Sequence, residues 1–391
     1  MSIQTTTIPP GSAPDITGDP GPNLLIGANG PVISGASRII RGMGGGDTVY
    51  TGPGNNTVVG GPGNNNYTAG SGFNTLDYSG SPNGTTINLR NGMAQNGYGG
   101  TDTISSFKAF AGSASNDAFL IGPGNVSIDG RGGTDTVAFT GQYANYTISY
   151  SATTKADTIT DLRSASPDGT NTVTNVEILQ FADGTANLDS AGRLASAIIN
   201  KSDGSRTAYA WDTQNQYNWS DYTISTDAQG RTTTQTTDYD NGTRSLEVWD
   251  VLNKNPWVDY IYYYDSQGRT TGQTVDYHNG TRTVQAWDVL NQNTWSDYVY
   301  SYDTQGRATS QSVDYRSGIR TAQYWDVLNQ NTWSDWVGYY DSQNRETTHF
   351  VDNHDGTHTA QYFDVQSQNT WTSWVGSYDS QNRETTHFVN N

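Results

Sequence analysis

The chain has 391 residues, no Cys and a formal net charge of −18 at pH 7. The lack of Cys excludes disulfides and Cys-ligated metal sites, and no apolar run approaches the ~20 residues of a membrane-spanning helix, so membrane insertion is not expected. Because the acidic charge repels phosphate backbones and attracts cations, nucleic acid is not an expected partner.

Residues 1–16 have neither a basic region nor an apolar core, so they are predicted to be a flexible N-terminus without a signal peptide. Of the 44 Gly, 33 lie in residues 1–200, whereas all 11 Trp lie after residue 200. This shift predicts a Gly/Asn-rich domain over 17–190, a linker over 191–200 that includes a short helix, and an aromatic repeat domain over 201–391.

Four consecutive nine-residue blocks stand out in the first domain. They are GMGGGDTVY (42–50), TGPGNNTVV (51–59), GGPGNNNYT (60–68) and AGSGFNTLD (69–77). Each block has Gly at its fourth position, where it permits a tight turn, and an apolar residue at its eighth position, predicted to point inward from a short strand: Val49, Val58, Tyr67 and Leu76. Since no single block buries its apolar residue alone, the blocks predict a stacked parallel β-roll.

This pattern resembles the RTX, or haemolysin-type calcium-binding, nonapeptide repeats. The fragments 97–105, 112–122 and 130–139 fit the same pattern, and residues 160–185 resemble the closing module that often follows it. The resemblance implies Ca²⁺ held between stacked turns by the sixth-position carboxylate and by turn carbonyl oxygens, which suit a hard cation. It also implies an extracellular or cell-surface location, reached by bacterial type I-like export without an N-terminal signal peptide.

The candidate calcium ligands are the sixth-position residues of these repeats. They are Asp47, Asn56, Asn65, Asn74, Asp102, Asp117 and Asp135. Asn keeps an oxygen but lacks the charge, so the three Asn turns are expected to bind Ca²⁺ weakly or to be held by amide hydrogen bonds instead. Asp102, Asp117 and Asp135 keep the carboxylate, but each is expected to lie in an isolated copy without an equally good neighbour. A few weak calcium sites and a calcium-independent Asn ladder both remain open.

The second domain contains five copies of a 38-residue unit. Two aromatic positions recur in it: Trp211, Trp249, Trp287, Trp325 and Phe363, followed eight residues later by Trp219, Trp257, Trp295, Trp333 and Trp371. Each unit has three reversals, at an Asn-Gly-type pair, at a segment such as DSQGR (265–269) and at a segment such as LNQN (290–293). The unit therefore predicts three strands, about fifteen in all.

These numbers constrain the architecture. A WD-type propeller blade needs four strands, and a fully antiparallel closed barrel needs an even strand number. We therefore predict an all-β chain in which an N-terminal parallel, RTX-like β-roll is followed by an elongated antiparallel β-repeat array of five 38-residue units. The segment YDSQGRTT (264–271) also resembles the YD repeat of RHS-type and teneurin-like surface proteins, but only over about eight residues of each unit, so no function is carried over from it.

The Asn-Gly-type turns predict a pairing register. If they are two-residue turns, Tyr277 lies opposite Arg282 and Tyr315 opposite Arg320, as cation–π pairs.

Strand alternation makes a second prediction, on which aromatic rings share a face. It places Tyr298, Tyr300 and Tyr302 on one face of the sheet, and Trp295 with Val299 on the other.

The aromatic series also supplies the candidate ligand-binding residues. They are Trp219, Trp257, Trp295, Trp333, Trp371, Tyr277 and Tyr315. Exposed rings beside polar groups suit sugar rings, and five weak sites gain by avidity; the alternative is that the rings only hold the sheet together. No nucleophile elbow, P-loop or dinucleotide fingerprint is present, so no catalytic residue and no enzyme activity are expected.

The sequence thus predicts a secreted, non-enzymatic, calcium-binding-type repeat protein that presents an aromatic β surface for adhesion to glycans or other cell-envelope components. One alternative is a structural surface-layer or extracellular-matrix component, in which the chain self-associates. A second alternative is the accessory region of a secreted enzyme.

Overall fold

The computed structural model describes residues 15–18, 21, 24–26 and 38–391. The predicted flexible N-terminus lies outside these residues except for Asp15 and Ile16. The fold is all-β, as predicted, and its described helical structure is one 3-10 turn, Tyr143–Asn145. The chain divides into two compact units, residues 1–215 and 216–391, a boundary fifteen residues beyond the end of the expected linker.

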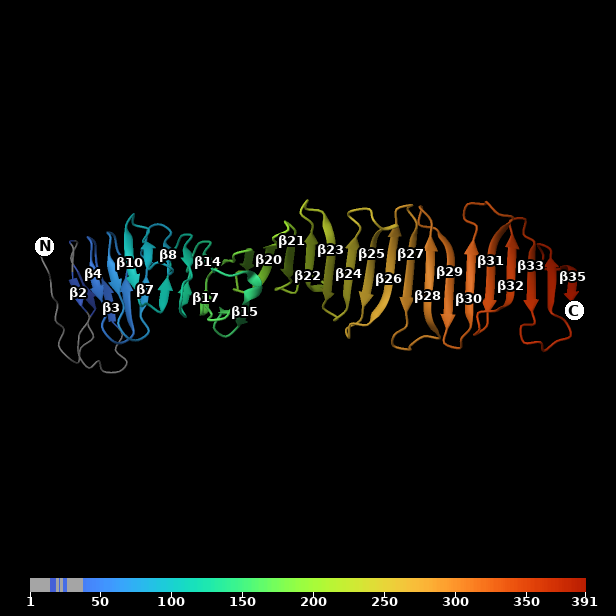
Figure 1. Cartoon of the computed structure of the whole chain (residues 1–391), viewed down its shortest axis with the longest axis horizontal. Helices are drawn as coiled ribbons and strands as arrows, with labels where there is room; N and C mark the ends of the chain where they lie inside the picture. Colours follow the sequence, from blue (N-terminus) through green and yellow to red (C-terminus); the bar gives the residue numbers. More distant parts are fainter. Residues whose placement is uncertain (1–14, 19–20, 22–23, 27–37) are drawn as a thin grey trace. The chain divides into compact units, whose positions relative to one another are not determined.

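The N-terminal unit is a β-roll in which the chain alternates between two sheets (Figure 1). One sheet has the order β1 (Ile16–Thr17), β3 (Arg38–Arg41), β5 (Asn56–Val59), β7 (Thr75–Asp77), β11 (Ala109–Ala111), β13 (Ser127–Asp129), β17 (Thr170–Thr174), β16 (Ala156–Asp161) and β15 (Tyr146–Ser151). The other pairs in the order β2 (Leu24–Ile26), β4 (Thr48–Tyr50), β6 (Asn66–Thr68), β10 (Thr101–Ser105), β9 (Met93–Gln95), β8 (Thr86–Asn88), β12 (Ala118–Leu120), β14 (Thr136–Ala138), β18 (Ile178–Gln180), β19 (Gly184–Leu188), β20 (Leu194–Asn200) and β21 (Arg206–Trp211).

Two nonapeptides make one turn of the roll. Val58 pairs with Leu76 and Val49 with Tyr67, each 18 residues apart, in neighbouring parallel strands. All four of these predicted inward residues are fully buried between the two sheets. Since burying such a side chain contributes about 1.5–3 kcal/mol, the stacked apolar residues supply the main stabilisation of the roll.

The expected helix in the linker 191–200 is wrong. Residues 194–200 form β20, which pairs antiparallel with β19 and with β21. Ala197 is fully buried on one side of this strand, whereas Ile198 is partly exposed on the other. The two neighbouring strands offer a complete set of backbone hydrogen bonds, and this tertiary context overrides the helix preference of a short Ala- and Leu-containing segment.

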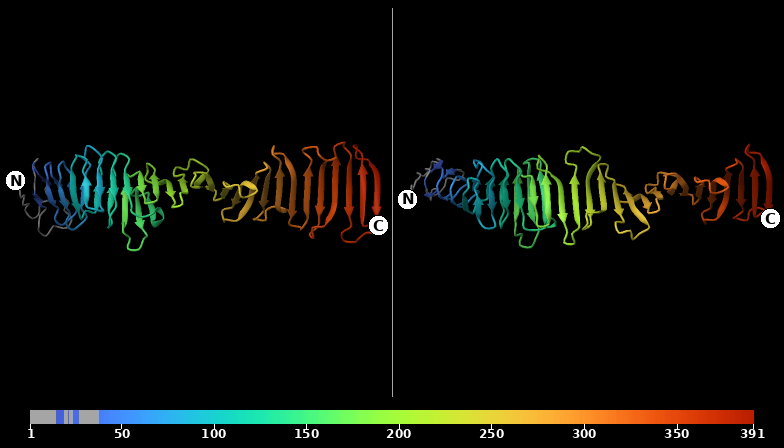
Figure 2. Two further views of the ribbon diagram at one scale, coloured as in Figure 1. Left: turned by 45° about the horizontal axis from the view of Figure 1, so that its top comes forward. Right: turned by 90° about the horizontal axis from the view of Figure 1, so that it is seen from above.

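The second unit is one antiparallel sheet in which each strand pairs with the next. Its strands are β22 (Trp219–Thr226), β23 (Thr232–Tyr239), β24 (Arg244–Trp249), β25 (Trp257–Tyr264), β26 (Thr270–Tyr277), β27 (Arg282–Trp287), β28 (Trp295–Tyr302), β29 (Ala308–Tyr315), β30 (Arg320–Trp325), β31 (Trp333–Tyr340), β32 (Glu346–Asn353), β33 (His358–Phe363), β34 (Ser373–Tyr378) and β35 (Glu384–Asn390). Each complete 38-residue unit contributes three strands, as predicted. Figure 2 shows the twist of this sheet. All strands of residues 216–391 belong to it, so most of its side chains stay half-buried on one face or the other.

The predicted register of the Asn-Gly-type hairpins is wrong by one residue. The Tyr277 N–H donates to the Thr281 carbonyl and the Gly280 N–H to the Tyr277 carbonyl, which makes a three-residue loop closed by a bulge at Gly280. Arg282 consequently pairs with Asp276 and not with Tyr277. The same shift pairs Arg320 with Asp314 in place of Tyr315, so the expected cation–π pairs give way to ion pairs.

A second bulge corrects the placement of the Trp rings. Tyr298, Tyr300 and Tyr302 share a face as predicted, because each pairs with an alternate residue of β27. The register shifts between Trp295 and Asp297, and the Trp295 ring contacts the Tyr298 ring at a centroid distance of 5.0 Å. Trp295 therefore extends the Tyr row and does not lie with Val299.

Candidate functional site

The sixth-position residues of the RTX-like repeats form buried ladders. All seven predicted residues are at most 3% exposed. Five of them directly precede a strand, and Asn56 and Asp102 lie at the start of one, so residues of alternate repeats contact each other across one turn of the roll. The Asp47 N–H donates to Asn65 Oδ1, and the Asn56 N–H donates to Asn74 Oδ1, both at 2.9 Å.

The carboxylates gather at one edge of the roll. Asp47, Asp102, Asp117 and Asp135 all lie just before or at the start of strands of the sheet that contains β4 and β14, whereas Asn56 and Asn74 lie at the start of strands of the other sheet or just before them. Asp117 and Asp135 are direct neighbours, since the Asp117 N–H donates to Asp135 Oδ1 at 2.7 Å. The expectation that each carboxylate lies in an isolated copy is therefore wrong for Asp117 and Asp135. It overlooked that one turn of the roll holds two nonapeptides.

The Asn turns are held by amide hydrogen bonds. Asn56 Nδ2 donates to Asn74 Oδ1 at 3.0 Å, and Asn74 Nδ2 donates to the Gly70 carbonyl at 3.0 Å. A second ladder, which the sequence analysis missed, comes from fifth-position Asn residues: Asn55 and Asn64 accept the N–H of Phe73 and Thr101, each at 2.8 Å. The two adjacent Asn residues of the repeated sequence GPGNN could have indicated this second ladder.

Asp102 is fully hydrogen-bonded by neutral groups. Its Oδ1 accepts from the Asn65 N–H, from Asn65 Nδ2 and from Asn96 Nδ2 at 2.9–3.0 Å, and its Oδ2 accepts from the Tyr78 hydroxyl at 2.8 Å. Burial raises the pKa of Asp102 above its usual value. This carboxyl needs no cation to satisfy its oxygens.

Asp135 differs, because one of its oxygens is orphaned. Asp135 is 0% exposed, and its Oδ2 has no hydrogen-bond partner. Burial, together with the nearby carboxylates of Asp117 and Glu177, raises the pKa of Asp135 to about 7. A Cβ built on Gly130 would lie 2.5 Å from Asp135 Oδ2 and would overlap the carbonyl oxygen of Asn175, so both oxygens converge beside a residue that must be Gly.

This donor set fits a hard divalent cation. Asp135 Oδ2 and the Asn175 carbonyl are the oxygens that would hold it, and neutralising the buried carboxylate is what a bound Ca²⁺ would supply. Asp117 directs its Oδ2 to the N–H of Ser113 at 2.7 Å. Among the described residues, no group of three or more Asp, Glu or His side chains could hold a metal, so main-chain oxygens must complete the site.

We expect millimolar Ca²⁺ to raise the melting temperature of the N-terminal unit. At 100 times the Kd, binding to the folded state stabilises by about 2.7 kcal/mol, or about 5–10 °C for a unit of this size. Asp135→Asn should remove most of this increment, because it removes the charge at the orphaned oxygen. Asp102→Asn, measured as the difference between melts with and without Ca²⁺, is the control and should keep it. An increment that survives in Asp135→Asn would contradict this assignment.

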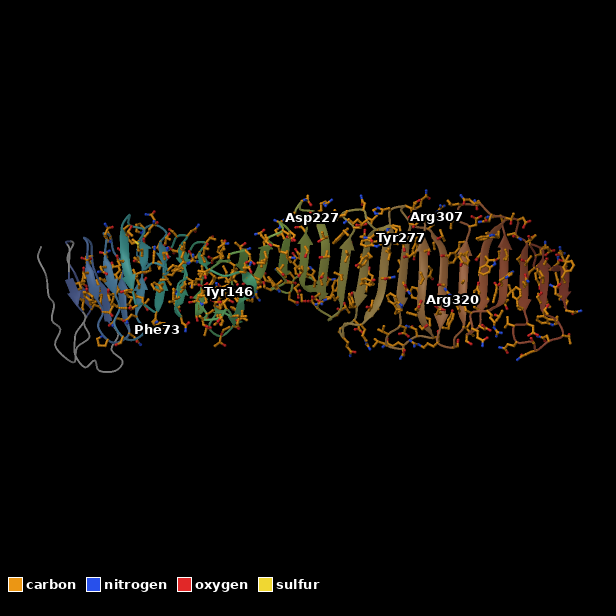
Figure 3. All side chains as sticks on the ribbon, in the orientation of Figure 1. Phe73, Tyr146, Asp227, Tyr277, Arg307 and Arg320 are labelled. Carbon is orange, nitrogen blue, oxygen red and sulfur yellow. The ribbon has the colours of Figure 1, made fainter. Side chains whose placement is uncertain are left out.

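In the second unit, the structure brings four of the seven predicted aromatic residues together in two pairs. Trp257 pairs across the strands with Tyr277, and Trp295 with Tyr315; the second pair is offset from the first by three strands. Trp219 pairs instead with Tyr239 and Trp333 with Asn353, and Trp371 precedes β34. All seven predicted residues are half-buried. Figure 3 places Tyr277 at the end of its strand.

Each of two central copies also carries a row of rings that the sequence did not fully reveal. We call these rows the aromatic stripes: Trp257, Tyr260, Tyr262 and Tyr264 in β25, and Trp295, Tyr298, Tyr300 and Tyr302 in β28. Neighbouring ring centroids lie 4.8–6.4 Å apart. These contacts stabilise the strand surface by about 0.5–1.5 kcal/mol per pair, and the stripes remain partly open to solvent.

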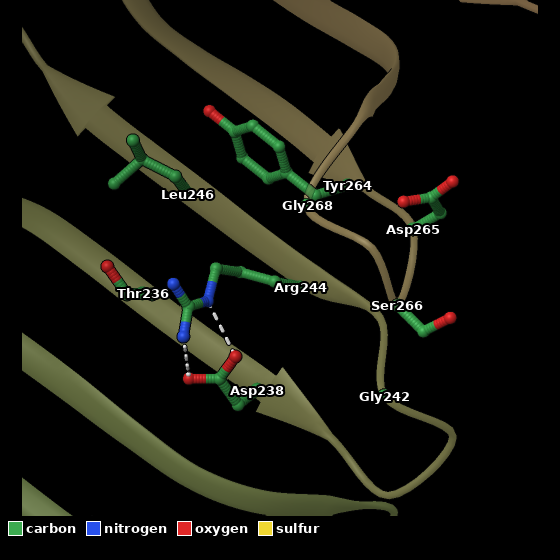
Figure 4. Close-up of a pocket in the computed structure, with 9 residues that line it drawn as sticks. All are labelled: Thr236, Asp238, Gly242, Arg244, Leu246, Tyr264, Asp265, Ser266 and Gly268. Carbon is green, nitrogen blue, oxygen red and sulfur yellow. Dashed lines mark hydrogen bonds and ion pairs between the residues drawn. The ribbon is translucent and has the colours of Figure 1, made fainter. Parts of the chain in front are cut away.

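A pocket lies at the end of each aromatic stripe, and Figure 4 shows the one beside Tyr264. The first has a volume of about 430 Å³ and the second about 410 Å³, and their lining residues are equivalent by a shift of 38. In the first, Arg244 Nε and Nη2 donate to the two carboxylate oxygens of Asp238 at 2.6 and 2.8 Å, beside Leu246 and Tyr264. Sequence analysis missed these pockets, although Asp and Arg recur six residues apart in three copies.

Comparison with known proteins identifies the first set of repeats. The model of the RTX calcium-binding nonapeptide repeat matches residues 41–76 in four copies; such repeats bind calcium and are typical of secreted proteins. No curated protein matches the chain. Solved structures that align with it include a crystal structure of the eukaryotic initiation factor (7% identity, 65% of this chain, 87% of that chain, TM-score 0.15) and apo AztD from Citrobacter koseri (10%, 61%, 92%, 0.14). None of the described residues forms a helix long and apolar enough to cross a membrane.

Proposed function

We propose that this chain, whose residues 41–76 are RTX calcium-binding nonapeptide repeats, is a secreted, non-enzymatic protein that uses its second unit to adhere to carbohydrate chains. Export by a type I-like route is part of the proposal. In this reading the β-roll is a calcium-stabilised module, and the repeat sheet is the adhesive surface.

One observation carries the carbohydrate proposal: the aromatic stripes run along strands of a single sheet that no second layer of residues 216–391 covers. Sugar rings have apolar C–H faces and hydroxyl rims. Tyr and Trp supply both an apolar ring and a polar group, and the Asp–Arg pairs beside the stripes supply acceptors and donors. Repetition of one weak site along the chain strengthens binding through avidity.

The test is a glycan array probed with the full chain, followed by variants. Trp257→Ala combined with Trp295→Ala should weaken binding about 2- to 13-fold at each of the two sites, because each site loses one aromatic contact worth about 0.5–1.5 kcal/mol. Trp249→Ala combined with Trp287→Ala removes the same number of rings outside the aromatic stripes and is the matched control. Equal losses in the two double variants would argue that the rings only stabilise the sheet, and an array without binding would overturn the proposal.

A further inference from the structure

The arrangement of turns that forms the two pockets recurs in four consecutive copies. In each, the Gly of one hairpin turn lies beside a Ser or Thr of the next turn along the same edge: a Cβ on Gly242, Gly280, Gly318 or Gly356 would lie 2.8–3.1 Å from a side-chain carbon of Ser266, Thr304, Ser342 or Ser380, respectively. We number these positions sites 1 to 4. Sites 1 and 2 are the two pockets described above.

The register places site 1 and site 2 on opposite faces of the sheet. Paired residues on adjacent strands share a face, and successive residues along a strand alternate between faces. Leu246, in site 1, pairs with Tyr262, which in turn pairs with Gln273. Asp276, in site 2, lies three residues after Gln273 in the same strand and is therefore on the other face.

The sites also alternate between the two ends of the strands, so that successive sites lie on opposite long sides of the sheet. Each unit has three strands, an odd number, so the hairpin that follows β23 and the one that follows β26 lie at opposite ends of the strands. Figure 3 shows Arg307, in the turn beside site 2, at one edge and Arg320, in site 3, toward the other. Each site is thus related to the next by a rotation of half a turn about an axis perpendicular to the strands, together with the twist of the sheet. The same step moves the site about 14 Å along the sheet, the width of three strands.

The chemistry of the pockets favours a neutral, hydroxyl-rich ligand. In site 1 both acids are already paired: Asp238 with Arg244, and Asp265 with Arg269 at 2.7 Å. The same pairs recur in site 2 at Asp276 and Asp303. A charged ligand would have to break an ion pair, whereas sugar hydroxyls can donate to the carboxylates and accept from the guanidinium. Leu246 and Tyr264 leave an apolar wall for a C–H face.

We propose that the second unit is a cross-linker of neutral polysaccharide chains. Because neighbouring sites face opposite sides, one chain that lies on one face of the sheet reaches every second site, and a separate chain occupies the others. This inference rests on the carbohydrate adhesion proposed above, and it adds that one molecule of the protein joins two ligand chains.

The test compares two double variants of the full chain that each keep two sites. Thr304→Trp with Ser380→Trp fills sites 2 and 4 and leaves two sites on one face. Ser342→Trp with Ser380→Trp leaves sites 1 and 2, on opposite faces. The substituted residues are exposed turn positions, so folding should be kept. Gln267→Trp with Gln305→Trp, in the turns of sites 1 and 2 but not among the residues that line the pockets, is the control. The probes are beads coated with dextran, mannan, xyloglucan or arabinogalactan.

Both double variants should bind short oligosaccharides of the recognised polysaccharide. The variant with sites on opposite faces should still aggregate the beads, and the variant with sites on one face should aggregate them at least tenfold less. Equal aggregation by the two variants, with binding retained, would overturn the cross-linking inference while leaving the adhesive function intact. Binding to none of the four polysaccharides would overturn both proposals.

Discussion

Gly63→Ala is expected to destabilise the β-roll by about 2–6 kcal/mol. Gly63 has φ +106°, a conformation that costs a side-chain-bearing residue about 1–3 kcal/mol, and a Cβ there would overlap the carbonyl of Gly45 in the turn stacked next to it. Relieving this overlap would force the two turns apart, with an overpacking cost of similar size. Thermal melting followed by circular dichroism would measure the effect.

Gly124→Ala is the matched control. Gly124 has φ +117°, and a Cβ there would meet nothing within 4 Å. It should therefore show the backbone cost alone, about 1–3 kcal/mol. If both variants lose the same stability, close stacking of successive turns does not stabilise the roll, and the account of its core would have to change.

Arg163→Met is expected to lower the unfolding free energy of the N-terminal unit by about 3–5 kcal/mol, or about 6–20 °C in melting temperature. The Arg163 guanidinium pairs with Asp161 at 2.8 Å and with Asp168 at 3.1 Å, and both carboxylates are buried. Without Arg163 these charges stay buried and uncompensated. Arg131→Met, at an exposed residue whose ion pairs are 3.6 and 3.9 Å long, should cost less than about 1 kcal/mol.

The pH dependence gives the Arg163 prediction a second readout. Hydrogen bonds from the Arg163 side chain lower the pKa of Asp161 to about 2 from its usual 3.8. A depressed pKa contributes stability above pH 3.8 that is lost as the pH falls from about 4 to 2. The native chain should show this acid-induced loss, and Arg163→Met should show less of it. A variant that keeps the whole loss would contradict the pairing of Arg163 with Asp161.

The sequence predicted the two repeat systems because each has a period that the backbone can satisfy in one way. In the roll, apolar residues nine positions apart must enter one core, so the burial of Val49, Val58, Tyr67 and Leu76 followed directly. The sequence did not predict which residues contact the acidic residues. Asn65 meets Asp102, 37 residues away, because residues 78–100 insert β8 and β9 between two turns, and no local pattern records where such an excursion rejoins the stack.

In the second unit, a difference of one residue in the length of a hairpin loop determines which residues form a candidate site. The Asn-Gly-type pairs correctly predicted hairpins but not their loop length, since both two- and three-residue loops accept Gly at positive φ. The longer loop moved Arg282 from Tyr277 to Asp276. It thereby created the Asp–Arg pair of the pocket, which the sequence analysis had no means to place.

The half-turn between neighbouring 38-residue units determines what happens when the number of repeat copies changes. A duplication that adds one 38-residue copy lengthens the sheet by three strands and reverses the orientation of every copy after it. The fold tolerates this, because both faces are built from the same residues. The number of copies therefore sets how many sites lie on each face of the sheet. An even number of sites is divided equally between the two faces, and an odd number gives one face an extra site.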